Sequence, residues 1–221
     1  MYQIRKYNWE DRNKHYWSSD WHVFHDPSWK VPIWEKRGYL NAQDAAEQIL
    51  RKINERVGEN DTLWYLGDIF LNSTDEMCLN WMNGLRCKDI KFVWGNHESN
   101  MWRLYKEEVK KQYNLEDVEI YPLKMGNIEF IGNKAEIRIG KRNIVMNHFP
   151  EHSWNGMGRK SWILSGHSHN SDKTRNPDSP INYCLDTGWD WKRDVWSYSE
   201  IEDVMSTKTF VSVDHHEKDT H

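Results

Sequence analysis

Short apolar segments alternate with polar ones along most of this chain. Each apolar segment is rich in β-branched and aromatic residues, has the length of a strand, and is bounded by Gly, Asn, Asp or Pro. We predict strands at residues 16–17, 62–66, 90–94, 118–121, 128–131, 135–139, 143–146, 162–164 and 181–185.

Three segments between the early strands have the periodicity of amphipathic helices. Residues 41–57 place alanine, isoleucine and valine on one face, with Asn41 as the predicted N-cap and Gly58 as the predicted stop. A second helix is predicted from residue 73 or 74 to residue 83, and a third from about residue 100 to residue 112.

The two halves of the chain differ in pattern. The first half alternates strands with helices, whereas residues 118–146 read as strand after strand, joined by three glycine-containing turns. This combination predicts an α/β fold in which two β-sheets face each other and helices cover the outside. Residues 1–213 are predicted to form a single domain, and the polar residues 214–221 a mobile tail.

Composition narrows the class of protein. Only 38% of the 221 residues are hydrophobic, but 14 Trp, 10 Tyr and 6 Phe provide enough apolar area for a core. A net charge of −4 predicts neither an extended nucleic-acid surface nor an anionic membrane as partner. Three cysteines without CxxC spacing, no apolar signal segment and no bilayer-length apolar stretch predict a cytoplasmic protein.

Five segments place side chains that can bind metal directly after an apolar segment. In open α/β sheets the loops at the carboxyl ends of strands converge, so these side chains are expected at one edge. In an extended chain, residues two apart point to the same side. Two of the five segments contain such a pair, Asp20 with His22 and His167 with His169. The five segments contain Asp20 with His22, Asp68, Asn96 with His97 and Glu98, His148, and His167 with His169.

This inventory exceeds the ligands of one metal ion and predicts a two-metal site, with ions roughly 3.5–4 Å apart and Asp68 as a candidate bridge. Nitrogen and oxygen ligands without thiolate suit Mn first, with Fe, Zn, Ni and Mg as alternatives. Two divalent ions carry more positive charge than Asp20, Asp68 and a bridging hydroxide remove. The remaining positive charge favours the binding of a phosphoryl group, which the hydroxide would attack in line.

Each signal alone has an ordinary structural explanation. A histidine at a strand end is often a capped surface residue, and Gly, Asn and Asp are common turn formers. Five such signals, each after a predicted strand, favour a metal site instead. His25 is expected either to reach this site or to cap a turn, while His15 and His152 are predicted at the surface.

Taken together, these motifs resemble the signature of the calcineurin-like metallophosphoesterases. That signature runs D-x-H, G-D, G-N-H-[D/E], H and G-H-x-H, and every part is present in order between Asp20 and His169. The segment L-D-T-G-W-D at residues 185–190 also looks like the strand that closes the family domain. The resemblance implies a four-layer αββα sandwich with two facing mixed β-sheets.

The resemblance also implies a role for each residue. One metal would be held by Asp20, His22, Asp68 and His169, and the other by Asp68, Asn96, His148 and His167. His97 would lie over the phosphate and stabilise the transition state or protonate the leaving oxygen. Glu98 would orient His97 or a metal ligand, with a solvated turn carboxylate as the alternative.

Departures from the family pattern narrow the subclass. Gly67 and Asp68 continue as I-F-L-N, which differs from the protein phosphatases, so the sequence is similar to small, uncapped bacterial and phage phosphoesterases. The expected substrate is a small phosphoester, most simply a phosphodiester or nucleotide, whose base Trp154, Trp189 or Trp191 could stack. The alternatives are a single-strand nuclease and a non-catalytic binding scaffold with this fold.

Overall fold

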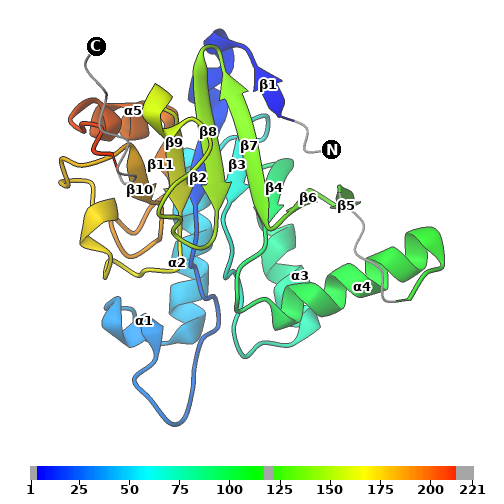
Figure 1. The fold of residues 1–221 in the computed structure, drawn as a ribbon. Helices are drawn as coiled ribbons and strands as arrows, with labels where there is room; N and C mark the ends of the chain where they lie inside the picture. Colours follow the sequence, from blue (N-terminus) through cyan, green and yellow to red (C-terminus); the bar gives the residue numbers. More distant parts are fainter. Residues whose placement is uncertain (1–3, 117–121, 213–221) are drawn as a thin grey trace, which may run out of the picture.

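The computed structural model describes residues 4–116 and 122–212, and within these ranges the chain forms two mixed β-sheets that face each other (Figure 1). The five-stranded sheet has the order β1 (Arg5–Tyr7), β7 (Lys134–Ile139), β8 (Arg142–Asn147), β9 (Trp162–Ser165) and β10 (Cys184–Asp186). The six-stranded sheet has the order β11 (Trp196–Ser197), β2 (His15–Ser18), β3 (Thr62–Tyr65), β4 (Asp89–Val93), β6 (Ile128–Gly132) and β5 (Leu123–Met125).

One hydrophobic core lies between the two sheets, and a larger one lies between the six-stranded sheet and its helices. In β7, Ala135, Ile137 and Ile139 are buried while the residues between them are more exposed, as expected for a strand with one face on the core. All four residues of β3 are buried because both faces of this central strand are covered. The Trp17 indole in β2 donates a 3.1 Å hydrogen bond to the sulfur of Met146 in β8, across the sandwich.

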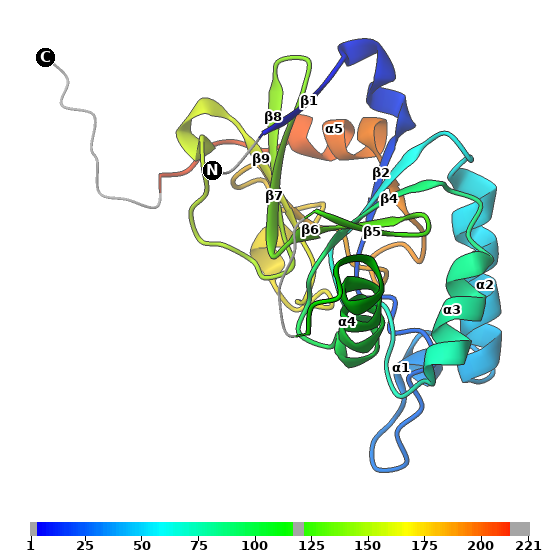
Figure 2. The ribbon, with the colours of Figure 1, turned by 90° about the vertical axis from the view of Figure 1, so that its right-hand side faces the viewer.

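Helices cover the outer face of the six-stranded sheet (Figure 2). The three predicted helices are confirmed as α2 (Ala42–Arg56), α3 (Asp75–Asn83) and α4 (Ser99–Tyr113). The Asn41 side chain caps α2 by accepting from the Asp44 amide at 2.8 Å, as the sequence predicts. Short α1 (Ile33–Lys36) follows a projecting loop, and α5 (Tyr198–Ser206) packs on β2 and β11.

A thinner layer covers the five-stranded sheet. There Trp154 and Met157, the first residue of the 3₁₀ turn η2 (Met157–Arg159), pack on Val145 and Ile163. The other 3₁₀ segments are η1 (Trp9–Lys14) and η3 (Lys173–Arg175). The predicted sandwich of two mixed sheets with helices is confirmed, although its fourth layer consists of loops and 3₁₀ turns.

Several local predictions differ from the structure. One of the three predicted glycine-containing turns, at Gly132, does not join two adjacent strands. The chain instead crosses there from β6 in one sheet to β7 in the other. His15 is buried rather than exposed, and its Nδ1 accepts from the Trp64 indole at 3.1 Å. The predicted strand at 118–121 and the predicted tail at 214–221 lie outside the described residues. Within the described part of the chain, no helix is long and apolar enough to cross a membrane.

An ion cluster joins the two sheets at one edge. Arg5 in β1 donates to both carboxylate oxygens of Glu129 in β6, at 2.5 and 3.0 Å. Lys91 in β4 reaches the same carboxylate at 2.5 Å. The hydrogen bond from Arg5, followed by that from Lys91, outweighs the effect of burial and lowers the pKa of Glu129 to about 2.

The charge of Glu129 should therefore stabilise the fold. Because its pKa is lower in the folded chain, this contribution is present above about pH 4.5 and disappears as the pH falls toward 2. We expect Glu129→Gln to reduce the free energy of unfolding by roughly 2 kcal/mol at pH 7, after allowance for solvent screening. Urea unfolding followed by tryptophan fluorescence at pH 7 and pH 3 measures this.

The exposed Glu10 provides the control, and Glu10→Gln should leave the unfolding free energy near that of the wild type. A Glu129→Gln loss that is equally large at pH 3 and pH 7 would contradict this account.

Candidate metal centre

The predicted site residues follow strands that end side by side. In the six-stranded sheet, Ser18 pairs with Tyr65 and Tyr65 with Phe92 in parallel register, so β2, β3 and β4 end together. In the other sheet β8 and β9 are also parallel and end at the same side of the sandwich. The loops after these five strands carry Asp20, Asp68, Asn96, His148 and His167, respectively.

Three of the predicted ligands form a first cluster. The Nε2 atoms of His22 and His169 lie 3.1 Å apart. The same atoms lie 3.9 and 3.7 Å from Oδ1 of Asp20. One ligand atom from each residue therefore lies within 4.8 Å of the others, which is the spacing needed to surround one cation.

The other four predicted ligands form a second cluster beside the first. Oδ1 of Asn96 lies 2.8 Å from Nε2 of His148 and 2.9 Å from Nδ1 of His167. Oδ2 of Asp68 lies 3.5 Å from Nε2 of His148 and 3.8 Å from Nε2 of His22. Asp68 therefore faces both clusters, as a bridging ligand would, and an oxygen of Asp20 also lies within 4.8 Å of ligand atoms of Asp68 and His148.

The backbone that carries these residues is not extended, contrary to the expectation for the two pairs spaced two apart. Five of the seven predicted ligands have backbone dihedral angles in the left-handed region, a conformation that costs a non-glycine residue on the order of 1 kcal/mol. Such conformations persist only where surrounding contacts enforce them. The five residues are Asp20 (φ 57°), His22 (φ 46°), Asp68 (φ 64°), His167 (φ 69°) and His169 (φ 45°).

Two glycines make room for the carboxylates. A Cβ atom at Gly95 would overlap Oδ1 of Asp68, and one at Gly166 would overlap Oδ2 of Asp20. Each glycine thus permits backbone and carboxylate to approach closely.

The chemistry of these residues fits divalent metal ions. Asp20 and Asp68 are buried, and within the described ranges no lysine or arginine forms an ion pair with either carboxylate. Burial raises the pKa of Asp20 to about 7, and the opposing effect of nearby His169 only partly offsets it. Burial also lowers the pKa values of His22 and His148, which keeps these imidazoles in the neutral form that binds metal.

Comparison with known proteins agrees with this geometry. The family model described as calcineurin-like phosphoesterase matches residues 16–205. The chain belongs to this family. A solved structure, that of a protein of unknown function named AQ665 from Aquifex aeolicus, shares the fold with a TM-score of 0.57 and 18% identity, over 86% of this chain and 98% of that one. The search of curated proteins found no match.

Backbone amides hold both carboxylates of this calcineurin-like phosphoesterase. The His97 amide donates to Oδ1 of Asp68 at 2.8 Å, and the His167 amide donates to the carboxylate of Asp20 at 3.0 Å. The His97 side chain is exposed at the rim, with its ring centre 5.7 Å from that of His22. His97 is thus beside the ligands without a ligand contact of its own among those described.

Glu98 lies beneath the site, so a solvated turn carboxylate is the wrong interpretation. It is buried, and its Oε1 accepts from the backbone amide of Asp68. Burial, reinforced by the charge of Asp68, raises the pKa of Glu98 to about 8. The contact supports the candidate bridging ligand and not His97.

Arg37 and Asp190 are supporting residues that motif analysis did not identify. Asp190 accepts from Nδ1 of His169 at 2.6 Å and from Nε of Arg37 at 2.7 Å. Buried Arg37 also donates to the backbone carbonyl oxygens of Asp20 and Trp21. Burial raises the pKa of Asp190, but these two partners outweigh it and the net pKa lies well below its usual range. The family-like segment at 185–190, which ends on Asp190, was the only sequence signal.

Two cavities flank the metal centre of this phosphoesterase. One, of about 420 Å³, is lined by Trp94 and Trp102 next to Asn96. The other, of about 580 Å³, is lined by His25, His169 and other residues. The tryptophans proposed to stack a base are placed differently: Trp154 and Trp189 are buried in the cores, and Trp191 packs against the inter-sheet core.

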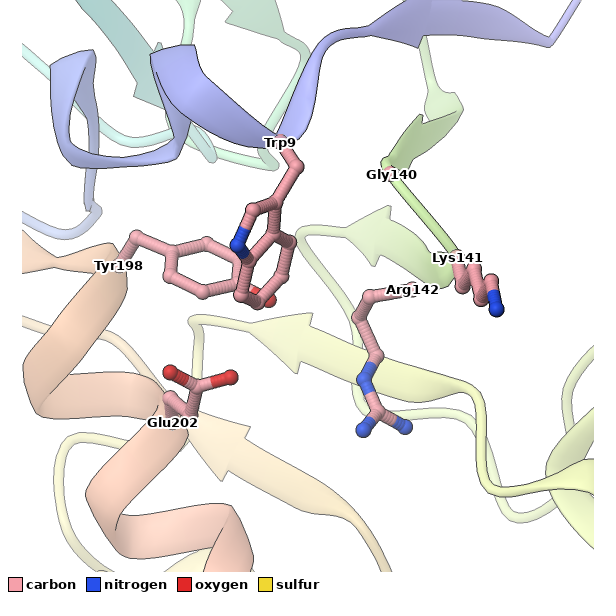
Figure 3. Close-up of a pocket in the computed structure, with 6 residues that line it drawn as sticks. All are labelled: Trp9, Gly140, Lys141, Arg142, Tyr198 and Glu202. Atoms are coloured by element: carbon pink, nitrogen blue, oxygen red, sulfur yellow. The ribbon is translucent and has the colours of Figure 1, made fainter.

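An apolar cavity of about 530 Å³ lies at the other end of the sandwich, where β8 begins (Figure 3). Trp9 and Tyr198 form its aromatic wall, beside Arg142. Since β8 starts at Arg142 and ends next to His148, this cavity is separated from the metal centre by the length of the strand.

The contact between Asp190 and His169 generates a prediction. We expect Asp190→Asn to weaken the binding of Mn²⁺ by about 10–100-fold, because the imidazole loses the carboxylate that orients it and raises its basicity. Isothermal titration calorimetry on the metal-free protein measures this affinity.

The matched control is Asp194→Asn, since Asp194 pairs with Arg56 at 2.9 Å and not with a predicted ligand. If Asp190→Asn binds Mn²⁺ as tightly as the wild type, or if both variants lose the same affinity, Asp190 does not support His169 as a metal ligand.

Proposed function

We propose that this calcineurin-like phosphoesterase uses two divalent metal ions, Mn²⁺ first among the candidates, to hydrolyse a phosphodiester of a small or nucleotide-like substrate. The observation that carries the proposal is the position of Asp68, whose carboxylate faces both ligand clusters. When bound, the two ions would neutralise the phosphoryl oxygens and supply the nucleophile.

The residues of the chain would then act as follows. His97, exposed at the rim, would face the phosphoryl group and stabilise its developing charge or protonate the leaving oxygen. Glu98 would hold the loop of Asp68 from below. Asn96, as a neutral ligand, would leave the positive charge of the centre intact.

The flanking cavities support a diester over a monoester. A diester carries a substituent on each side of its phosphorus atom, and the ligands lie between one cavity lined by Trp94 and Trp102 and another lined by His25 and His169. The aromatic cavity is suited to a base or another planar group. Three free cysteines, all buried, are consistent with the cytoplasmic location that we propose.

The first test is hydrolysis of model esters. With Mn²⁺ added, the protein should hydrolyse bis(p-nitrophenyl) phosphate faster than p-nitrophenyl phosphate, and EDTA should abolish the reaction until Mn²⁺ is restored. Release of p-nitrophenol measures both reactions. If the protein binds metal and hydrolyses neither ester, the binding scaffold is the better interpretation; rapid cleavage of a labelled single-stranded oligonucleotide would instead support a nuclease.

The second test separates the roles of His97 and Asp68. His97→Ala should retain the metal content of the wild type but lower kcat at least about 10²-fold, because it removes the proposed proton donor. Asp68→Asn should lose metal, because it removes a charge that faces both clusters. Metal analysis together with kinetics measures both, and equal metal loss in the two variants would refute the division of roles.

A further inference from the structure

The cavity beside His169 differs in charge from the rest of the chain. The net charge of the protein is −4, but this cavity of about 580 Å³ is lined by four lysine or arginine residues and a single carboxylate. Its walls come from the projecting loop, α1, the residues at His169 and the loop between β10 and β11. The residues used below are His25, Lys30, Lys36, Arg37, Asp190 and Arg193.

The charges in this cavity do not balance. Arg37 and Asp190 form an ion pair at 2.7 Å and cancel each other. The ammonium of Lys30 lies 4.6 Å from the ring centre of Trp29. Within the described ranges, no carboxylate forms an ion pair with Lys30, Lys36 or Arg193. Three positive charges thus remain without an acidic partner at the mouth of the cavity.

Two neighbouring cations outside the cavity, Arg56 and Lys192, are paired with carboxylates. Arg56 contacts Asp194 at 2.9 Å and Glu200 at 2.8 Å. Lys192, next to Arg193 in sequence, contacts Glu200 at 2.5 Å. Cations without an acidic partner also occur elsewhere in the described part of the chain, as at Lys52 and Lys88, so the cavity is distinguished by three of them lining the same hollow.

His25 adds a neutral donor to the same wall. Its Nδ1 lies 3.0 Å from the backbone nitrogen of Ile33, which can only donate, so Nδ1 accepts. In the neutral ring the proton is then on Nε2, which is free to donate. Of the two alternatives for His25, the structure shows the cap, at the start of α1, and His25 lines the cavity beside His169.

This cavity adjoins the metal centre through His169. His169 and Asp190 line it, and Nε2 of His169 lies 3.1 Å from Nε2 of His22. A group bound among Lys30, Lys36 and Arg193 would therefore be part of the same substrate whose phosphoryl group is at the metal centre.

We propose that this cavity binds a second phosphate group of the substrate, so that the preferred phosphodiester carries a terminal phosphate on one of its substituents. The inference rests on the proposed function. Three unpaired cations and one neutral donor match a dianionic phosphate with several acceptor oxygens better than a single carboxylate. A compact cavity, as opposed to a basic stripe, favours a small phosphorylated substrate over a nucleic-acid strand.

Two esters that differ by one phosphate test this proposal. Thymidine 5′-(p-nitrophenyl phosphate) and its 3′-phosphorylated form both release p-nitrophenol on hydrolysis, and the two esters differ only in the second phosphate. With Mn²⁺ bound, we expect the wild-type protein to have a KM about tenfold lower for the 3′-phosphorylated ester, with similar kcat. In Lys36→Gln and Arg193→Gln, both at exposed positions, the ratio of the two KM values should fall toward one.

The matched control is Lys88→Gln, which removes one exposed charge before β4 and should keep the wild-type ratio. Equal KM values in the wild type, or a preference that survives in the Lys36→Gln/Arg193→Gln double variant, would overturn the proposal.

A binding measurement separates this inference from the proposed function. Calorimetry with thymidine 3′,5′-bisphosphate should give a dissociation constant about tenfold higher in the double variant than in the wild type. If the wild type hydrolyses neither ester, the proposed function fails, and calorimetry alone then tests whether the cavity binds a phosphate group. Equal binding of the bisphosphate by the wild type and the double variant would refute the phosphate site.

Discussion

Two buried carboxylates, those of Asp20 and Asp68, form the constraint on which the rest of this structure depends. Their oxygens have no lysine or arginine partner in the described part of the chain, and such burial is costly unless a cation compensates it. The sandwich brings them together because β2 and β3 are parallel neighbours with aligned ends. Left-handed backbone at both residues and room beside Gly95 and Gly166 complete the arrangement.

The surroundings of the metal centre explain how a substrate could be selected. Arg37 and Asp190 neutralise each other while orienting His169, so they support the centre without adding net charge to it. On one side of the ligands the cations are unpaired, and on the other the cavity is lined by Trp94 and Trp102. A phosphodiester with a phosphorylated substituent and a planar substituent would match this asymmetry.

Local patterns were sufficient to predict that the candidate ligands converge at one edge, because each motif lies directly after its own apolar strand. The family signature supplied the fold class for the same reason. Contacts between distant segments could not be predicted: Arg37 and Asp190 are 153 residues apart, Arg37 lies in no motif, and the family-like segment that ends on Asp190 does not indicate its partner. The left-handed backbone of His22 and His169 was missed because spacing two apart suggests an extended chain, whereas the geometry here is imposed by surrounding loops. The short strand β11 pairs through only two residues, too few to produce a periodic signal.

The central claim is that Asp68 lies between two metal ions. The most direct test is a crystal grown with Mn²⁺ and measured for anomalous scattering. The account predicts two peaks roughly 3.5–4 Å apart. One should be bounded by Asp20, His22 and His169, the other by the cluster of Asn96, with Asp68 contacting both. A single peak, or two peaks of which only one contacts Asp68, would contradict it.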